Sequence, residues 1–371
     1  MNAYVIYDNT EHDLNLLQWG HFSSPDAFLA LKIKDKTIAF VSELEYGRCK
    51  STSIFTEVYL LSNIRMLLKK QFPSLPYWTA LFKYLQKEFY IDTFIIPYHF
   101  PAKIYSEIFT HVPILFDQSS FNKQRAIKTT TEVNELKTAC QLTASTIDYA
   151  KSILRKCTNL NGILHFNNEV LTSERLRSLM EIFCLQNGGI SKGTIIACGQ
   201  DAVNPHCQGY GPLYANELIV IDFFPRLKNS HYYGDMTRTV IVGKSSNQQE
   251  KLYQCVLQCQ HELILRIKSG ISVKTLMEFA VQFFEQSGYG LKKSENGCEG
   301  FIHSVGHGLG LDLHEYPSVS YNDIILEAGM VITIEPGLYF YDIGGVRIED
   351  DVLVTEDGCE ILSKCDYNLT L

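Results

Sequence analysis

Five side chains of the kind that bind metal ions occur along the C-terminal half of the chain, each in a segment predicted to be a strand or the edge of one. They are Asp222, Asp235, His307, Glu335 and Glu349. Without cations, gathering four carboxylates and one imidazole in one fold would cost several kcal/mol per group. Two divalent cations would cancel the formal charge of minus four. Oxygen-rich ligation with a single imidazole favours Mn²⁺ first, with Zn²⁺, Co²⁺ or Fe²⁺ as alternatives.

The two aspartates belong to a predicted hairpin. Residues 216–224 are a short apolar run that ends near Asp222, and residues 232–242 are a second run that begins near Asp235. Runs of this length, rich in valine, isoleucine and tyrosine, are typical of strands. The sequence therefore predicts two paired strands with a carboxylate at the end of one and at the start of the other.

The remaining three candidate ligands lie in the last seventy residues. Residues 303–317 contain three histidines among glycines, which allow the backbone to approach a bound group closely. Residues 329–339 and 344–355 are predicted as two further strands, and each presents a glutamate among apolar neighbours. A carboxylate in such surroundings needs a partner. Two ions about 3.5–4 Å apart would supply one, and could together activate a bridging water.

These motifs resemble those of the pita-bread metallopeptidases, the group of methionine aminopeptidase, aminopeptidase P, prolidase and creatinase. That family binds two metal ions through a first Asp, the Asp of Asp-x-Thr-Arg-Thr, the His of Gly-His-Gly-x-Gly, the Glu of Glu-Pro-Gly and the Glu of Arg-Ile-Glu-Asp. All five positions are matched here, and the similarity extends from about Arg125 to the C-terminus. The aspartate spacing is about two residues longer than usual, and an even insertion keeps Asp235 on the same strand face.

The resemblance implies a role for each ligand. Asp235 and Glu349 are expected to bridge both ions, His307 and Glu335 to complete one ion, and Asp222 to complete the other. In the family's usual account a metal-bridging hydroxide attacks the peptide carbonyl. Glu335 also takes the proton from the attacking water. Glu335 is therefore expected to be both a ligand and a catalytic group.

Five further residues are candidates for the active site. His206, His303 and His314 match the family's other active-site histidines, and imidazoles suit proton transfer and hydrogen bonds to a tetrahedral intermediate. Tyr339 and Arg347 lie close in sequence to metal-binding glutamates. They are candidates for substrate contact or for support of the ligands, and a purely structural role is equally compatible with the sequence.

The extra N-terminal region and the arrangement of histidines resemble the Xaa-Pro branch of the family. They imply an Xaa-Pro aminopeptidase, which releases the N-terminal residue from short peptides with proline in second position. The first alternative is an Xaa-Pro dipeptidase (prolidase). A methionine aminopeptidase and a non-catalytic binding protein on the same fold are weaker alternatives. A homodimer is expected by analogy alone.

The pattern of elements predicts two domains. Residues 1–122 alternate strands and helices and resemble the creatinase-like α/β N-terminal domain: a hairpin of residues 28–33 and 37–41, then helices near 57–71 and 77–89. Residues 123–371 are expected to form the α+β pita-bread catalytic domain. It begins with a long helix after a capping-box signature, Thr129 to Glu132, and includes helices near 247–268 and 272–287.

Composition narrows the expected compartment and partners. The chain has 371 residues and eleven cysteines, an odd and scattered set that favours free thiols in a reducing compartment. It contains neither an apolar run of membrane-spanning length nor the pattern of a signal peptide at its start, so a cytoplasmic protein without a membrane partner is expected. A net charge of −8 disfavours nucleic acid as the partner.

Overall fold

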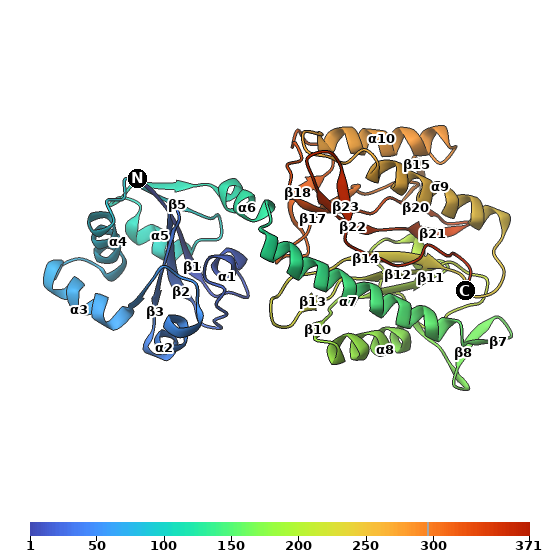
Figure 1. Cartoon of the computed structure of the whole chain (residues 1–371), viewed down its shortest axis with the longest axis horizontal. Helices are drawn as coiled ribbons and strands as arrows, with labels where there is room; N and C mark the ends of the chain where they lie inside the picture. Colours follow the sequence, from blue (N-terminus) through green and yellow to red (C-terminus); the bar gives the residue numbers. More distant parts are fainter. Residues whose placement is uncertain (295–296) are drawn as a thin grey trace. The chain divides into compact units, whose positions relative to one another are not determined.

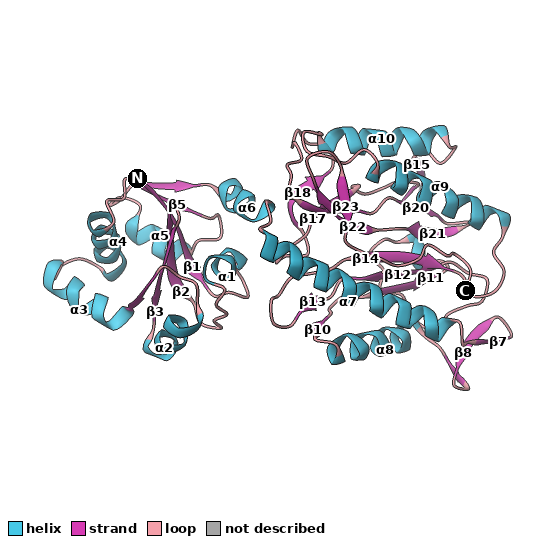
Figure 2. Cartoon of the chain, viewed as in Figure 1, coloured by secondary structure: helices cyan, strands magenta, loops and turns pink. Residues whose placement is uncertain are grey.

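The computed structural model describes residues 1–294 and 297–371. The chain divides into two compact units, Met1–Arg125 and Ala126–Leu371 (Figure 1). Both units contain helices and strands (Figure 2). Over the described ranges, no helix combines the length and apolar character that crossing a membrane requires.

The first unit is built on one mixed six-stranded sheet with the order β4-β3-β2-β1-β5-β6. Its strands are β1 (Asn2–Asp8), β2 (Phe28–Ile33), β3 (Lys36–Val41), β4 (Glu57–Leu60), β5 (Thr93–Ile96) and β6 (Ile114–Phe116). Helices α3 (Leu61–Gln71), α4 (Tyr77–Glu88) and α5 (Ala102–Ile108) bury apolar side chains on one face. Helices α1 (Leu14–Gly20), α2 (Glu43–Thr52) and α6 (Gln118–Ala126) contribute to the core of the other face.

The predicted elements of this unit are confirmed with one exception. The hairpin forms as β2 and β3, and the second predicted helix forms as α4. The helix predicted near 57–71 is wrong at its start, because residues 57–60 form β4, a strand parallel to β3. Val58 and Tyr59 favour a pleated surface over a helix. Tyr59 also stacks on Phe40 of the neighbouring strand, with ring centroids 5.1 Å apart.

The second unit contains several antiparallel sheets. A three-stranded sheet has the order β11-β12-β14, a five-stranded sheet has the order β18-β17-β19-β22-β23, and β20 pairs with β21. The bounds are β11 (Ile195–Cys198), β12 (Ile219–Phe223), β14 (Met236–Val240), β17 (Gly306–Gly308), β18 (Glu315–Val319), β19 (Val331–Ile334), β20 (Gly337–Phe340), β21 (Gly344–Arg347), β22 (Asp350–Val354) and β23 (Cys359–Ile361). The predicted hairpin forms as β12 and β14, with Asp222 opposite Thr237.

Four long helices cover these sheets (Figure 2). Helices α7 (Thr130–Leu154) and α8 (Ser173–Gln186) share a core with β11, β12 and β14. Helices α9 (Asn247–Ile264) and α10 (Val273–Gln286) share a core with β19 to β22. The smaller strands are β7 (Thr158–Leu160), β8 (Ile163–Phe166), β9 (Glu169–Val170), β10 (Gly189–Ile190), β13 (Arg226–Leu227), β15 (Lys292–Ser294) and β16 (Gly297–Glu299), and η1 (Asp201–Val203) is a short 3₁₀ helix.

The helix signals in the sequence are confirmed. The capping box at the start of α7 is complete, because Thr129 accepts from the backbone N–H of Glu132 and the Glu132 carboxylate accepts from the backbone N–H of Thr129. Helix α10 stops before Gly288, whose φ of +84° favours glycine. Helix α8 was not anticipated.

The two predicted glutamate strands are each broken in two, and this corrects the sequence expectation. Strand β19 ends before Glu335, and β20 begins after Pro336, which has no N–H to donate to a ladder. Residues 348 and 349 likewise separate β21 from β22. The breaks lie opposite each other, because β19 pairs with β22 and β20 with β21. Glu335 and Glu349 therefore both lie at the interruption of one hairpin, where the backbone N–H of Glu335 donates to the Val305 carbonyl oxygen and that of Glu349 to the Thr237 carbonyl oxygen.

Candidate metal centre

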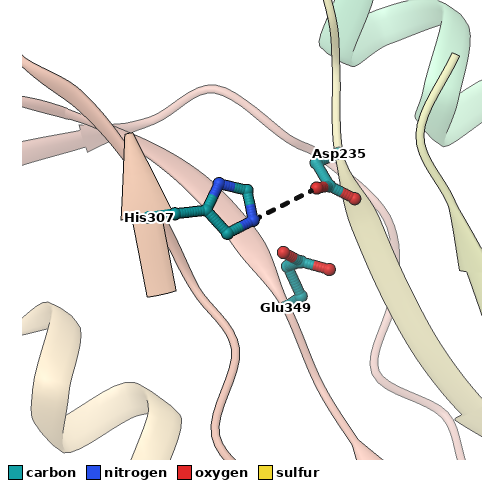
Figure 3. A group of neighbouring side chains, drawn as sticks. All are labelled: Asp235, His307 and Glu349. Carbon is teal, nitrogen blue, oxygen red and sulfur yellow. Dashed lines mark ion pairs between the residues drawn. The ribbon is translucent and has the colours of Figure 1, made fainter. Parts of the chain in front are cut away.

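Three of the five predicted ligands converge within the second unit. Asp235 lies directly before β14, His307 lies on β17, and Glu349 lies directly before β22. Each offers one donor atom, and these atoms all lie within 4.8 Å of one another. The imidazole of His307 faces the carboxylates of the other two residues (Figure 3). Residues that span 114 positions of the sequence, from 235 to 349, thus form one group of potential metal ligands.

The other two predicted ligands line the same cavity of about 900 Å³. Oε1 of Glu335 lies 3.5 Å from Nε2 of His307. Asp222 lies on β12, and its Oδ2 accepts a 2.7 Å hydrogen bond from Nη2 of Arg347. All five residues therefore line one cavity. Of the five, Asp235, His307 and Glu349 have donor atoms within 4.8 Å of one another.

The protonation of His307 suits a ligand. Its Nδ1 lies 3.0 Å from the carbonyl oxygen of Gly308, an acceptor that fixes the proton on Nδ1 and leaves the Nε2 lone pair facing the carboxylates. Burial, followed by the charge of His314, lowers the pKa of His307 to about 4. The imidazole is thus neutral at pH 7. Its separations from Asp235 and Glu335, 3.7 and 3.5 Å, leave room for an ion rather than marking ion pairs.

The oxygen atoms of the cluster fit divalent cations. Among the described residues, no hydrogen-bond partner exists for Oδ1 of Asp222, Oδ1 of Asp235 or Oε1 of Glu349, and all three atoms are buried. Buried polar atoms without partners are rare and require an explanation. Burial, followed by the charge of Asp222, raises the pKa of Asp235 well above its ordinary value. Burial, followed by the charge of Asp235, does the same for the pKa of Glu349. Cations would satisfy these oxygens and oppose both shifts.

A layer of hydroxyl and amide groups holds the carboxylates. Thr237 donates from Oγ1 to Oε2 of Glu349 over 2.7 Å. Thr333 donates to Oε1 of Glu335 over 3.4 Å and accepts from the backbone N–H of His307. Oδ2 of Asp351 accepts from the backbone N–H of Asp235 over 2.9 Å. Groups that orient ligands in this way fix the geometry of a metal site.

Arg347, which lines the cavity, and Tyr339, which lies behind it, form a buried hydrogen-bonded chain. Arg347 donates from Nη1 to the hydroxyl of Tyr339 over 2.8 Å and from Nε to Thr237 over 3.3 Å. The Tyr339 hydroxyl lies 2.9 Å from Nε2 of His303. Tyr339 is fully buried and is not among the residues that line the cavity. In this structure it supports His303 and Arg347 instead of facing a substrate.

The three outer histidines all line the cavity but differ in their contacts. His303 has both ring nitrogens engaged, Nδ1 with the Ser304 carbonyl oxygen and Nε2 with Tyr339. Burial lowers the pKa of His303 to about 4. The ring of His314 packs edge-on against His307, with centroids 4.3 Å apart. His206 lines the cavity with its neighbours Pro205 and Cys207.

Sequence reasoning missed the supporting residues Thr237, Thr333 and Asp351. One signal, a spacing of two residues from a ligand, could have found them. Thr237 lies two residues after Asp235 on one strand face, and Asp351 lies two residues after Glu349. Thr333 is likewise two residues before Glu335. In each pair, a polar side chain at an apolar strand position points to the same side as a ligand.

Comparison with known proteins now assigns the chain to a family. The model of metallopeptidase family M24 matches residues 134–356. The chain belongs to metallopeptidase family M24. Membership implies the use of divalent metal and confirms the predicted pita-bread fold with its additional N-terminal region.

Two kinds of relative place this M24 member beside Xaa-Pro peptidases. The Xaa-Pro dipeptidase of Pyrococcus furiosus is 35% identical over 247 residues, which are 66% of this chain and 65% of that protein. The chain thus matches slightly less than two thirds of that relative's length. The solved prolidase of Pyrococcus horikoshii is 27% identical, with a TM-score of 0.78 over 100% of this chain and 95% of the other. The X-Pro aminopeptidase of Thermotoga maritima has a TM-score of 0.81 over 100% and 98%, and at 23% identity it shows the fold alone.

Proposed function

We propose that this M24 protein is a dinuclear Xaa-Pro aminopeptidase. The observation that carries the proposal is the group of three buried carboxylate oxygens that have no hydrogen-bond partner among the described residues, on side chains that line one cavity together with His307. Asp235 and Glu349 would bridge two divalent ions, His307 and Glu335 would complete one, and Asp222 would complete the other. Mn²⁺ is the proposed ion, because oxygen ligands dominate the set.

The residues of the cavity have separate tasks in this proposal. When bound, the ions would polarise the peptide carbonyl and supply an activated water. Glu335 accepts the proton of that water, because its carboxylate lies beside His307 at the cavity wall. His206 and His314 face the cavity and donate hydrogen bonds to the carbonyl oxygen as charge develops on it. His303 is hydrogen-bonded to Tyr339 and positions the part of the cavity wall next to His206 and His314.

The hydrogen bonds and the burial of Arg347 favour aminopeptidase activity over dipeptidase activity. A dipeptidase must bind the free carboxylate of its substrate, for which arginine or lysine is the usual partner. Arg347 is the one arginine or lysine among the described residues that line the cavity. Its guanidinium already bonds Asp222, Tyr339 and Thr237 and is buried. A longer peptide, which has no carboxylate at that position, fits this cavity better.

The proposal is tested with protein loaded with Mn²⁺ and three peptides: Ala-Pro, Ala-Pro-Ala and Met-Ala-Ser. Release of alanine from Ala-Pro-Ala at a much higher kcat/KM than from Ala-Pro is the expected result. Cleavage of Ala-Pro alone would make the protein a dipeptidase, the function named for its Pyrococcus relative. Cleavage of Met-Ala-Ser alone would make it a methionine aminopeptidase, and cleavage of none would favour a binding protein.

We also propose the compartment, the substrates and the oligomeric state of the enzyme. All eleven cysteines are free thiols, which is compatible with a reducing cytoplasm. Short proline-containing peptides are the proposed substrates. Dimer formation is proposed from the family resemblance and is measured by light scattering.

A further inference from the structure

A second cleft lies next to the catalytic cavity in the second unit. Its volume is about 630 Å³. It is bounded by α10, by the segments around residues 289–291 and 301–304, and by residues 320–321. Three residues, Ile302, His303 and Ser304, line both this cleft and the catalytic cavity. The two spaces therefore share a wall.

The cleft is strongly apolar. Its floor contains the buried side chains of Phe284 and Phe301. Its rim exposes three large apolar side chains: Leu291 is 53% exposed, Ile302 is 37% exposed and Tyr321 is 60% exposed. Exposed apolar side chains gathered around one hollow usually mark a binding surface. Among the described residues that line the cleft, Glu285 is the one aspartate, glutamate, lysine or arginine.

We propose that this cleft binds an apolar side chain at the third position of the substrate peptide. The inference rests on the proposed function, because a dipeptide has no third residue. The ligand group fixes the scissile bond, and the proline that follows lies in the catalytic cavity. The next residue must leave that cavity, and the wall of residues 302–304 is where it meets an apolar space. Burial of an aromatic or aliphatic side chain there favours binding, and Glu285 disfavours an acidic one.

The proposal is tested by the kcat/KM values of the Mn²⁺-loaded enzyme for Ala-Pro-Phe, Ala-Pro-Gly and Ala-Pro-Asp. Partial burial of the phenylalanine ring should favour Ala-Pro-Phe over Ala-Pro-Gly about tenfold. Ala-Pro-Asp should be the poorest of the three. Leu291→Ser and Tyr321→Ser remove apolar rim, and each should reduce the Phe/Gly ratio to about two.

Leu185→Ser is the matched control. Leu185 lies on α8, is 59% exposed and does not line the cleft, so its variant should keep the ratio of the unmodified enzyme. A ratio near one in the unmodified enzyme, or rim variants that keep the tenfold ratio, would overturn the proposal. Faster cleavage of Phe-Pro-Gly than of Ala-Pro-Gly that the rim variants abolish would overturn it too, by placing the first residue in the cleft. Failure to cleave any of these peptides would instead contradict the proposed function.

Discussion

At the scale of single residues, the carboxylates of the cluster are oriented before any ion binds. Within the part of the chain that the structure describes, Asp222 has Oδ2 bonded to Arg347 and Oδ1 without a partner. Glu349 repeats the pattern within the same residues, with Oε2 bonded to Thr237 and Oε1 without a partner. One oxygen is thus fixed by the protein, while the other remains available to a cation. Held in this way, the ligands lose little conformational entropy on metal binding.

Replacing a bridging carboxylate should remove most of the metal. We expect Asp235→Ala to lose most bound Mn²⁺ and essentially all hydrolysis, because it removes a ligand of both proposed ions. Asp222→Ala should retain one ion. The measurement is metal content by mass spectrometry beside kcat/KM for Ala-Pro-Ala. Asp323→Ala is the control, since that side chain is 96% exposed. Near two ions per chain in Asp235→Ala would contradict the bridging role.

Two neighbouring histidines separate ligation from catalysis. His307 and His314 pack against each other, but only the first has a nitrogen facing the carboxylates. His307→Ala should therefore lose metal. His314→Ala should keep its metal and lose about 10²–10³ in kcat, the cost of removing one donor to a developing oxyanion. Metal analysis and single-substrate kinetics on both variants are required. Full activity in His314→Ala would make that histidine structural.

At the scale of elements, sequence patterns predicted the helices and strands that depend on nearby residues. The capping box of α7 follows from side chains three residues apart, and β12 pairs with β14 as consecutive apolar runs joined by one connection. The five candidate ligands were found from motifs, and the structure places them around one cavity. The contact of Asp222 with Arg347 could not be predicted, because it joins residues 125 positions apart. The break at Pro336 interrupts a hairpin whose two strands pair on both sides of it, and periodicity does not reveal such an interruption.

Strand β17 depends on a glycine. A Cβ on Gly306 would lie 2.0 Å from the carbonyl oxygen of Thr333, a backbone atom of the neighbouring strand. We expect Gly306→Ala to destabilise the second unit by about 1–3 kcal/mol, because the strands must move apart, and to weaken metal binding at the adjacent His307. Gly358→Ala is the control, since its Cβ would meet no atom within 4 Å. Denaturant titration measures the free energy of unfolding of both variants. Equal stability of the two variants would show that β17 accommodates the extra methyl group.

At the scale of the whole molecule, the two units differ in their buried ionisable side chains. The cluster of buried carboxylates lies entirely in Ala126–Leu371. In Met1–Arg125 the buried Asp13 is paired with His99, with Oδ2 and Nε2 2.8 Å apart. Hydrogen bonding to Asp13 raises the pKa of His99. Only the second unit should therefore respond strongly to divalent cations, and the first can serve as an internal reference.

The last prediction concerns stability against pH in metal-free protein. Burial raises the pKa of Glu335 from 4.5 to about 8 and that of Asp351 from 3.8 to about 7. Between pH 6.5 and 8 the folded unit still holds carboxyl protons that the unfolded chain has released, so its free energy of unfolding falls as pH rises. His303 and His307, with pKa values of about 4, are neutral in the folded state, and above pH 6.5 they are mostly neutral in the unfolded chain as well. Bound Mn²⁺ would replace the proton on Glu335, a proposed ligand, and its charge would oppose protonation of Asp351, which bonds the backbone of Asp235, so the loaded protein should lack the decline. Calorimetry with EDTA or Mn²⁺ at pH 6.5, 7.25 and 8 measures the midpoint of the second unit, and equal slopes in both conditions would contradict cation binding at these carboxylates.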